Sequence, residues 1–328
     1  MSDPAPQTPP APPGAWGGYL LVFIGVVLFA TVEVAVKDAN KCLPGGGFPP
    51  ILFAGIRFTI AGGLFVLLAL MNPSIKVKIP SGRDLWYTLL LGIIAAPVAI
   101  GLFQFALTFP ALKASSAAAI FSINPIFAAF FATLALREKV TTREWIGLML
   151  GFGGAMVMSF TLEGSDRTTL LKAGGVMIAS AVMFALNVVL SKPMIRRYGG
   201  LCFNGWAFLM GGIVAMLVSL PVEGLPETRL FTLSRGMADI AWVVIAGTAV
   251  AYYCYMVGIS RVSVTRGSYF FFVKPFLAFI VSLIYLGKDT TIFTAVEWTG
   301  FGMIVAGLAL IMFYPMAAQA LRRRVAPV

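Results

Sequence analysis

The sequence contains no histidine, and it has only three cysteines among its 328 residues. The cysteines, Cys42, Cys202 and Cys254, are scattered, without the spacing of a disulfide framework or of a metal-ligand set. Histidine is the side chain that most often transfers protons in enzymes near neutral pH, and it is the commonest metal ligand. We therefore expect no zinc or haem site, no histidine-based catalysis and no cofactor.

Charge is also scarce. Only 11% of the residues are charged and 59% are hydrophobic, whereas a soluble domain has roughly a quarter charged residues. Apolar stretches of about twenty residues recur along the chain, and a helix of that length crosses a hydrocarbon core of about 30 Å. The sequence thus predicts an all-α membrane protein with ten transmembrane helices. The expected spans are 17–38, 50–71, 85–108, 113–136, 145–162, 173–194, 202–220, 240–259, 266–286 and 297–315.

The segments outside these spans are short. Residues 1–16 are rich in proline and lack Lys and Arg, so they read as a disordered N-terminal tail rather than a cleaved signal peptide. Residues 316–328 form a basic C-terminal tail. Lys and Arg favour cytoplasmic loops, and placing both termini in the cytoplasm puts most of the flanking basic residues on that side of the inner membrane. The net charge of +11 is therefore a topology signal, and we expect no nucleic-acid partner.

One sequence pattern occurs twice, about 150 residues apart. Asn124-Pro125 in the first half matches Lys274-Pro275 in the second, and Glu144-Trp145 matches Glu297-Trp298. These matches divide the chain into a first five-helix repeat, 17–162, and a second, 173–315. Because five is an odd number, the second repeat must enter the membrane from the opposite side. Inverted repeats of this kind are typical of secondary transporters, which bind their substrate near the midplane between the copies.

The chain resembles a known family in these same features. Asn124-Pro125, the segment ALREKV that ends at Val140 and the following Glu-Trp-x-Gly helix are similar to those of the EamA-type exporters of the drug/metabolite transporter superfamily. The resemblance implies ten helices and the export of a small molecule. One departure is Gly287-Lys288-Asp289, where that family usually carries Gly-Glu.

A lysine within FFFVKPFLAF is the strongest candidate for a functional residue. Lys274 lies roughly 12 Å along its predicted span, close to the midplane. Charged residues at that depth usually face the interior of a helix bundle or a water-filled path. Pro275 removes a backbone donor, so we expect kinks at Pro275 and Pro125, with Lys274 and Asn124 beside them in a substrate site. The alternative is a packed cation that is neutralised by Glu33.

Two further charges lie within predicted spans. Glu33 precedes Lys37 by one helical turn, which is the favourable order for an intrahelical pair. Glu33 thus has three possible roles: it forms a salt bridge with Lys37 at the outer end of the span, it carries a proton, or it is the counter-ion of Lys274. Arg57 lies roughly 10 Å along the second span, where it can snorkel, pair with Glu33 or bind a carboxylate or phosphate. Weaker polar candidates for substrate contact are Gln104, Asn187, Tyr253 and Tyr255, since most such side chains join neighbouring helices.

These residues predict a secondary transporter, not an enzyme. We expect it to move a small polar metabolite of the amino acid or organic acid class by alternating access, with export implied by the resemblance. Its expected partners are the substrate, the lipid bilayer and protons as a candidate coupling ion. An alternative is an exporter of cationic drugs or quaternary amines that uses Glu33 and the abundant aromatic residues. A non-transporting membrane subunit or an enzyme is the alternative from a different class.

Overall fold

The protein is helical throughout the part of the chain that the computed structural model describes, and that part contains no β-strand. The described residues are 15–43, 48–73, 75, 77–110, 112, 114–160, 167–224, 235–286 and 295–312. The predicted tails, 1–16 and 316–328, lie outside them, except that Ala15 and Trp16 form the start of the first helix. All other expected elements fall at least partly within the described residues.

Fourteen α-helices are labelled in chain order. They are α1 (Ala15–Cys42), α2 (Pro50–Met71), α3 (Arg83–Ile93), α4 (Gly101–Thr108), α5 (Ala114–Phe121), α6 (Asn124–Leu136), α7 (Thr142–Phe160), α8 (Arg167–Tyr198), α9 (Gly200–Glu223), α10 (Arg235–Val244), α11 (Ala251–Arg261), α12 (Val264–Ser268), α13 (Lys274–Leu286) and α14 (Ala295–Met312). Several of these helices continue directly into the next one, so the number of helices exceeds the number of spans.

Eight helical segments in the described chain are long and apolar enough to cross a membrane. They are Trp16–Cys42, Pro50–Met71, Arg83–Thr108, Ser116–Leu136, Leu171–Tyr198, Gly200–Glu223, Gly236–Arg261 and Val264–Ile284. The two other expected spans coincide with α7, of 19 residues, and α14, of 18 residues, which contains the shorter apolar helix Trp298–Ile311. The protein is therefore a multi-pass helical membrane protein, and the count of ten remains a prediction.

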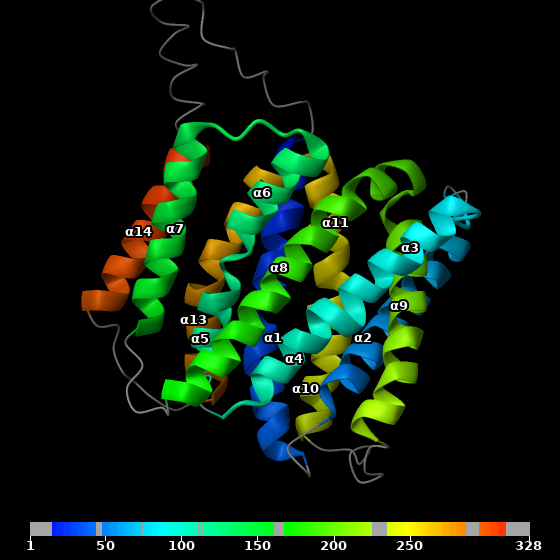
Figure 1. The fold of residues 1–328 in the computed structure, drawn as a ribbon, viewed down its shortest axis with the longest axis horizontal. Helices are drawn as coiled ribbons and strands as arrows, with labels where there is room; N and C mark the ends of the chain where they lie inside the picture. The colour runs from blue at the N-terminus through cyan, green and yellow to red at the C-terminus, as the bar shows by residue number, and fades with distance from the viewer. Residues whose placement is uncertain are drawn as a thin grey trace, which may run out of the picture.

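The helices form a bundle with α1 near its middle (Figure 1). At one edge α7 packs along α14, and on the other side α2 and α3 pack along α9 (Figure 1). Between these edges, α1 contacts α10, α11 and α13. Segments from both halves of the chain are thus interleaved through the whole bundle.

Glycines let the helices of the two halves approach closely, as in other membrane bundles. Gly55 of α2 lies against Met216 of α9, whereas Gly62, further along α2, lies against Leu209, which is earlier in α9. The two helices are therefore antiparallel. Helices α7 and α14 are antiparallel for the same reason, because Gly147 meets Ile311 and Gly154 meets Gly300.

Backbone irregularities interrupt the helices near the centre of the bundle. A π-helical segment, Ile94–Ile100, joins α3 to α4, and a second one, Ile245–Val250, joins α10 to α11. Such segments leave carbonyl groups available to side chains. Asn187 of α8 donates to the carbonyl of Leu91 at 2.8 Å, and Ser180 donates to that of Ala99 at 2.7 Å. These polar side chains therefore bind the irregular backbone.

The two prolines of the repeated pattern begin helices rather than bend continuous ones. A turn at Ser122 separates α5 from α6, and Pro125 lies in the first turn of α6. A 3₁₀ segment, Tyr269–Val273, leads into α13, in which Pro275 follows the first residue. Because Pro275 has no N–H, the carbonyl of Phe271 loses its helical donor. That carbonyl accepts instead from the backbone N–H of Lys274, three residues further on, and from the Ser122 hydroxyl at 2.9 Å.

The contact between α2 and α9 can be tested with two neighbouring glycines. An alanine Cβ at position 62 would lie 2.3 Å from the backbone nitrogen of Leu209, whereas one at Gly63 would meet nothing within 4 Å. We expect Gly62→Ala to lower the free energy of unfolding by about 1–3 kcal/mol through overpacking. Gly63→Ala is the matched control and should leave stability unchanged or slightly raised. Thermal unfolding in detergent measures both, and equal losses would contradict the close contact.

Candidate functional site

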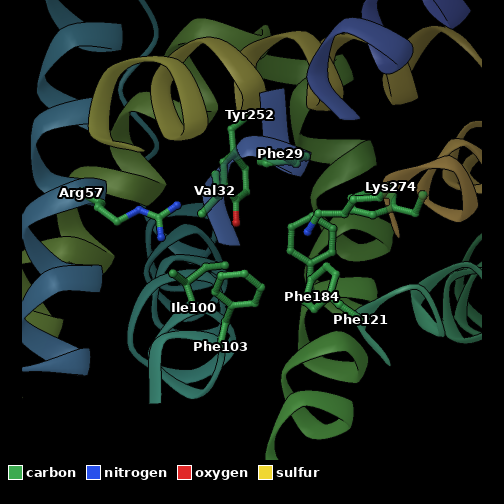
Figure 2. A pocket seen from close by; sticks show the side chains of 10 residues that line it. Phe29, Val32, Arg57, Ile100, Phe103, Phe121, Phe184, Tyr252 and Lys274 are labelled. Carbon is green, nitrogen blue, oxygen red and sulfur yellow. The ribbon is translucent and has the colours of Figure 1, made fainter. Parts of the chain in front are cut away.

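A cavity lies at the centre of the bundle, where segments of both halves meet. It encloses about 280 Å³ of empty space, part of which is open to solvent. Its lining residues are Phe29, Val32, Arg57, Ile100, Phe103, Phe121, Phe184, Tyr252, Phe271 and Lys274. Figure 2 shows Arg57 and Lys274 pointing into this space from opposite sides. The cavity is thus apolar over most of its wall, with a cation at each side.

Lys274 is the first residue of α13, and its ammonium group donates to the carboxylate of Glu33 on α1. Both side chains are almost completely buried. The ammonium nitrogen also lies 4.6 Å from the ring centre of Phe121 and 5.4 Å from that of Phe103. Aromatic faces attract a cation, most strongly where water is excluded. The carboxylate and the two rings therefore stabilise the charge of Lys274 inside the bundle.

Arg57 reaches the cavity from α2 and is only 1% exposed. Its Nε donates to the hydroxyl of Thr248 at 2.9 Å, and that hydroxyl donates to the carbonyl of Val243 at 2.7 Å in the second π-helical region. Nη1 of Arg57 has no hydrogen-bond partner among the described residues. The irregular backbone near Thr248 thus fixes one edge of the guanidinium and leaves another edge with an unused donor.

The charges of the site do not balance among the residues described here. Two cations, Arg57 and Lys274, line the cavity, and one carboxylate, Glu33, is paired with Lys274. Oε2 of Glu33 and Nη1 of Arg57 are both without a hydrogen-bond partner in the described structure. Buried polar atoms are normally paired, so these two atoms are available to a ligand or to water. No cluster of acidic, cysteine or histidine residues that could hold a metal occurs in the described chain.

Aromatic rings form the rest of the wall. Phe29 and Phe184 meet edge to face at 6.1 Å, and Phe271 packs against both, at 5.9 Å and 5.6 Å. Phe121 lies 5.5 Å from Phe184. The hydroxyl of Tyr252 points into the space between the two cations (Figure 2). The site therefore combines a large apolar wall with few polar groups.

The other residues predicted for the site lie in different places. Gln104 and Asn124 are buried, and neither amide has a hydrogen-bond partner in the described part of the chain, but neither residue lines the cavity. Asn187 binds the backbone of Leu91. Tyr253 is half-buried and packs on Phe65, with ring centres 6.1 Å apart. The structure thus brings together Lys274, Glu33 and Arg57 but gives Asn187 and Tyr253 other contacts.

Sequence reasoning missed Tyr252 and the phenylalanines of the wall. A helical stripe in the sequence could have found Tyr252, because Thr248, Tyr252, Tyr255 and Ile259 follow one another at spacings of three and four residues. All four are buried, whereas Tyr253 falls outside the stripe. The phenylalanines carried a second signal. Phe121 and Phe271 occupy matching positions before the two repeated prolines.

A family model for EamA-like transporters matches residues 16–160 and again residues 172–313. The chain belongs to the EamA-like transporter family. The two matched stretches together cover most of the described helices, and each contains about half of the residues that line the cavity. The protein is therefore a multi-pass membrane transporter, and transport of a small molecule across the bilayer is its activity.

Curated relatives agree with this assignment to the EamA-like family. An uncharacterized transporter of Clostridium kluyveri is 31% identical over 278 residues, which cover 83% of this chain and 86% of the relative. The uncharacterized inner membrane transporter YedA of Escherichia coli is 26% identical, over 80% of this chain and 82% of its own. A solved crystal structure with a TM-score of 0.72 and 16% identity covers 92% of this chain and 99% of its own, which shows the shared fold.

The buried ion pair of this EamA-like protein can be tested by a double-mutant cycle. Glu33→Gln leaves the ammonium of Lys274 buried without its counter-ion, so we expect a loss of about 3–5 kcal/mol in the free energy of unfolding. The double variant Glu33→Gln/Lys274→Met removes both charges and should recover most of that loss. Lys78→Met, at an exposed lysine, is the control and should have little effect. Additive effects at positions 33 and 274 would refute the pairing.

Proposed function

We propose that the protein exports a small metabolite with a carboxylate group, of the amino acid or organic acid class, by alternating access. The observation that carries the proposal is the cavity with Arg57 and Lys274 on opposite sides, where Glu33 is the one carboxylate of the described residues that pairs with either cation. An uncompensated charge in a low-dielectric site is costly, and a bound monoanion removes that cost. Arg57 is the proposed carboxylate ligand, because the planar guanidinium fits a carboxylate and its Nη1 donor is unused.

Alternating access needs two halves that can exchange roles, and we infer ten helices in two inverted repeats, 17–162 and 173–315. Helix α2 runs antiparallel to α9, and α7 runs antiparallel to α14, which are the second and the fifth span of each repeat. The start of α1 and the end of α8 lie at the same end of the bundle, since both Gly18 and Lys192 contact Val262. These opposite directions support inversion of one half relative to the other.

The charge distribution supports cytoplasmic termini for this transporter. Arg137, Arg196, Arg261 and Arg266 all lie at the end of the bundle where α1 begins. Lys and Arg are enriched in cytoplasmic segments of membrane proteins. We therefore place this end at the cytoplasm, and export carries the substrate from it to the opposite side.

A ligand screen on the purified protein tests the substrate class. Amino acids and organic acids are each compared with their amides, and quaternary amines are included. A ligand that binds only the folded protein raises its melting temperature, with about 2.7 kcal/mol gained at a hundredfold excess over Kd. We expect a carboxylate, but not its amide, to stabilise the wild type, and Arg57→Gln to lose the effect. Stabilisation by quaternary amines that survives in Arg57→Gln and is lost in Glu33→Gln would instead establish a cationic substrate.

Glu33 is the proposed carrier of a coupled proton, because it is the carboxylate paired to the cavity lysine. If protonation of Glu33 frees Lys274 during the cycle, an imposed pH gradient drives transport only while residue 33 can titrate. In liposomes loaded with the carboxylate from the screen, we expect the gradient to accelerate wild-type flux several-fold and to leave Glu33→Gln flux unchanged. If the pH gradient leaves the wild-type flux unchanged, transport is not coupled to protons.

A further inference from the structure

A second charged cluster lies away from the cavity, around Glu138, which is the second residue after the end of α6. Its carboxylate accepts a hydrogen bond from the ammonium of Lys192 at 2.9 Å and one from the Ser263 hydroxyl at 2.7 Å. The backbone N–H groups of Val264 and Thr265 donate to it at 3.1 and 3.3 Å, and the Thr265 hydroxyl donates at 3.1 Å. Five donors from two distant segments thus converge on one side chain.

These contacts tie three parts of the bundle together. Glu138 follows α6, Lys192 is on α8, and residues 263–265 begin α12. The Lys192 ammonium also donates to the carbonyl of Val262 at 2.7 Å, just before α12. A neighbouring pair strengthens the tie, since Arg266 donates to Glu144 of α7 at 3.0 Å. The first half of the chain therefore holds the start of α12 at one end of the bundle.

The tied segment leads directly to the cavity. From α12 the chain passes through the 3₁₀ segment Tyr269–Val273 to Lys274, so the cavity lysine and the cluster belong to one continuous stretch. Phe271 of that stretch is part of the cavity wall. A displacement of α12 away from Glu138 would therefore also move part of the wall.

A related contact occurs at the opposite end. Lys37 of α1 donates to the carbonyl of Phe109, just after α4, at 2.7 Å. Lys192 and Val262 make the same kind of contact between α8 and the segment that follows α11. At each end of the bundle, a lysine on a helix donates a hydrogen bond to the backbone carbonyl of the segment that leads to one of the two repeated prolines. Glu138 adds a carboxylate at its own end.

Glu138 is ionised under ordinary conditions. Burial alone raises its pKa, but the Lys192 ammonium and the hydrogen bonds from Ser263 and Val264 outweigh burial and hold the pKa below the usual value of a glutamate. Because the pKa is lowered in the folded state, the stabilisation is present at neutral pH and is lost only as the pH falls through that lowered pKa. The carboxylate of Glu138 is therefore charged at neutral pH.

We propose that Glu138, with Lys192, is the latch that closes the substrate cavity at this end, and that the latch must break for the cavity to open there. Because the carboxylate joins α6, α8 and α12, separation of these helices removes all five hydrogen bonds together. The proposal rests on alternating access, but its test uses no transported substrate, so a wrong substrate class leaves the test unaffected.

The experiment measures access to the cavity with a thiol reagent. Val32 lines the cavity and is replaced by cysteine in a chain whose three native cysteines are changed to serine. A membrane-impermeant anionic methanethiosulfonate reagent is applied to right-side-out and inside-out vesicles, so that it reaches one end of the bundle at a time. We expect slow labelling from the Glu138 end in the parent and about tenfold faster labelling from that end in Glu138→Gln, through a shift toward the open state.

Glu223 provides the matched control at the other end of the bundle. It too is a carboxylate that binds the start of a helix, accepting from the backbone N–H groups of Ile51 at 2.8 Å and Leu52 at 2.9 Å. Glu223→Gln should leave labelling from the Glu138 end unchanged. Lys192→Met should raise it by less than Glu138→Gln does, because Glu138 keeps four other donors.

Several outcomes would overturn the latch. They are fast labelling of the parent from the Glu138 end, no increase in Glu138→Gln, and equal increases in Glu138→Gln and Glu223→Gln. Melting temperature and size-exclusion profile show whether each variant is folded. If Glu138→Gln does not fold, Lys192→Met decides, since an unchanged labelling rate in that folded variant contradicts a charged latch.

Discussion

The ion pair between Glu33 and Lys274 is the interaction on which the rest of the site depends. A single charge inside a membrane bundle costs several kcal/mol, and only a counter-charge, aromatic faces or water reduce that cost. Here the carboxylate comes from α1 and the ammonium from α13, so the pair joins the two halves of the chain. Arg57 has no such carboxylate among the described residues; it is held by a neutral hydroxyl. The protein therefore keeps one buried cation neutralised internally and presents the other to the cavity.

The scaffold of the site repeats, but its charges do not. Phe121 and Phe271 occupy matching positions, and the two π-helical segments join corresponding helices, α3 to α4 and α10 to α11. In contrast, Asn124 matches Lys274, and neither Glu33 nor Arg57 has a charged match in the second half. A repeated scaffold supplies two ways of packing with similar energies, which alternating access requires. In the proposed function, the unmatched charges determine which substrate binds, without disturbing the scaffold that both halves share.

The sequence predicted the helical membrane fold and an interior position for Lys274, because hydropathy and the cost of intramembrane charge act locally. It left an outer-end position open for Glu33 and a snorkelling position open for Arg57. It could not choose the partner of Glu33. Lys37, one turn away on the same helix, was a plausible partner, yet the structure pairs Glu33 with a lysine 241 positions away and gives Lys37 the carbonyl of Phe109. Tyr253 was chosen over Tyr252 because residue type alone does not identify the buried face. Both points concern tertiary contacts, which only the packing of distant helices determines.

The excess cation, Arg57, and the proposed latch at Glu138 would affect two different steps of a transport cycle. Closing both ends over an empty cavity would enclose Arg57 with its unused donor and, within the described part of the chain, no carboxylate partner. A bound carboxylate supplies the missing charge and hydrogen bonds, so it stabilises the closed, loaded state more than the closed, empty one. Opening at the Glu138 end then requires breaking a tie of five hydrogen bonds that does not involve the substrate. In this proposal the charge of the cavity controls which states can close, and the latch controls how readily one end opens, so that substitutions at Arg57 and at Glu138 change different steps.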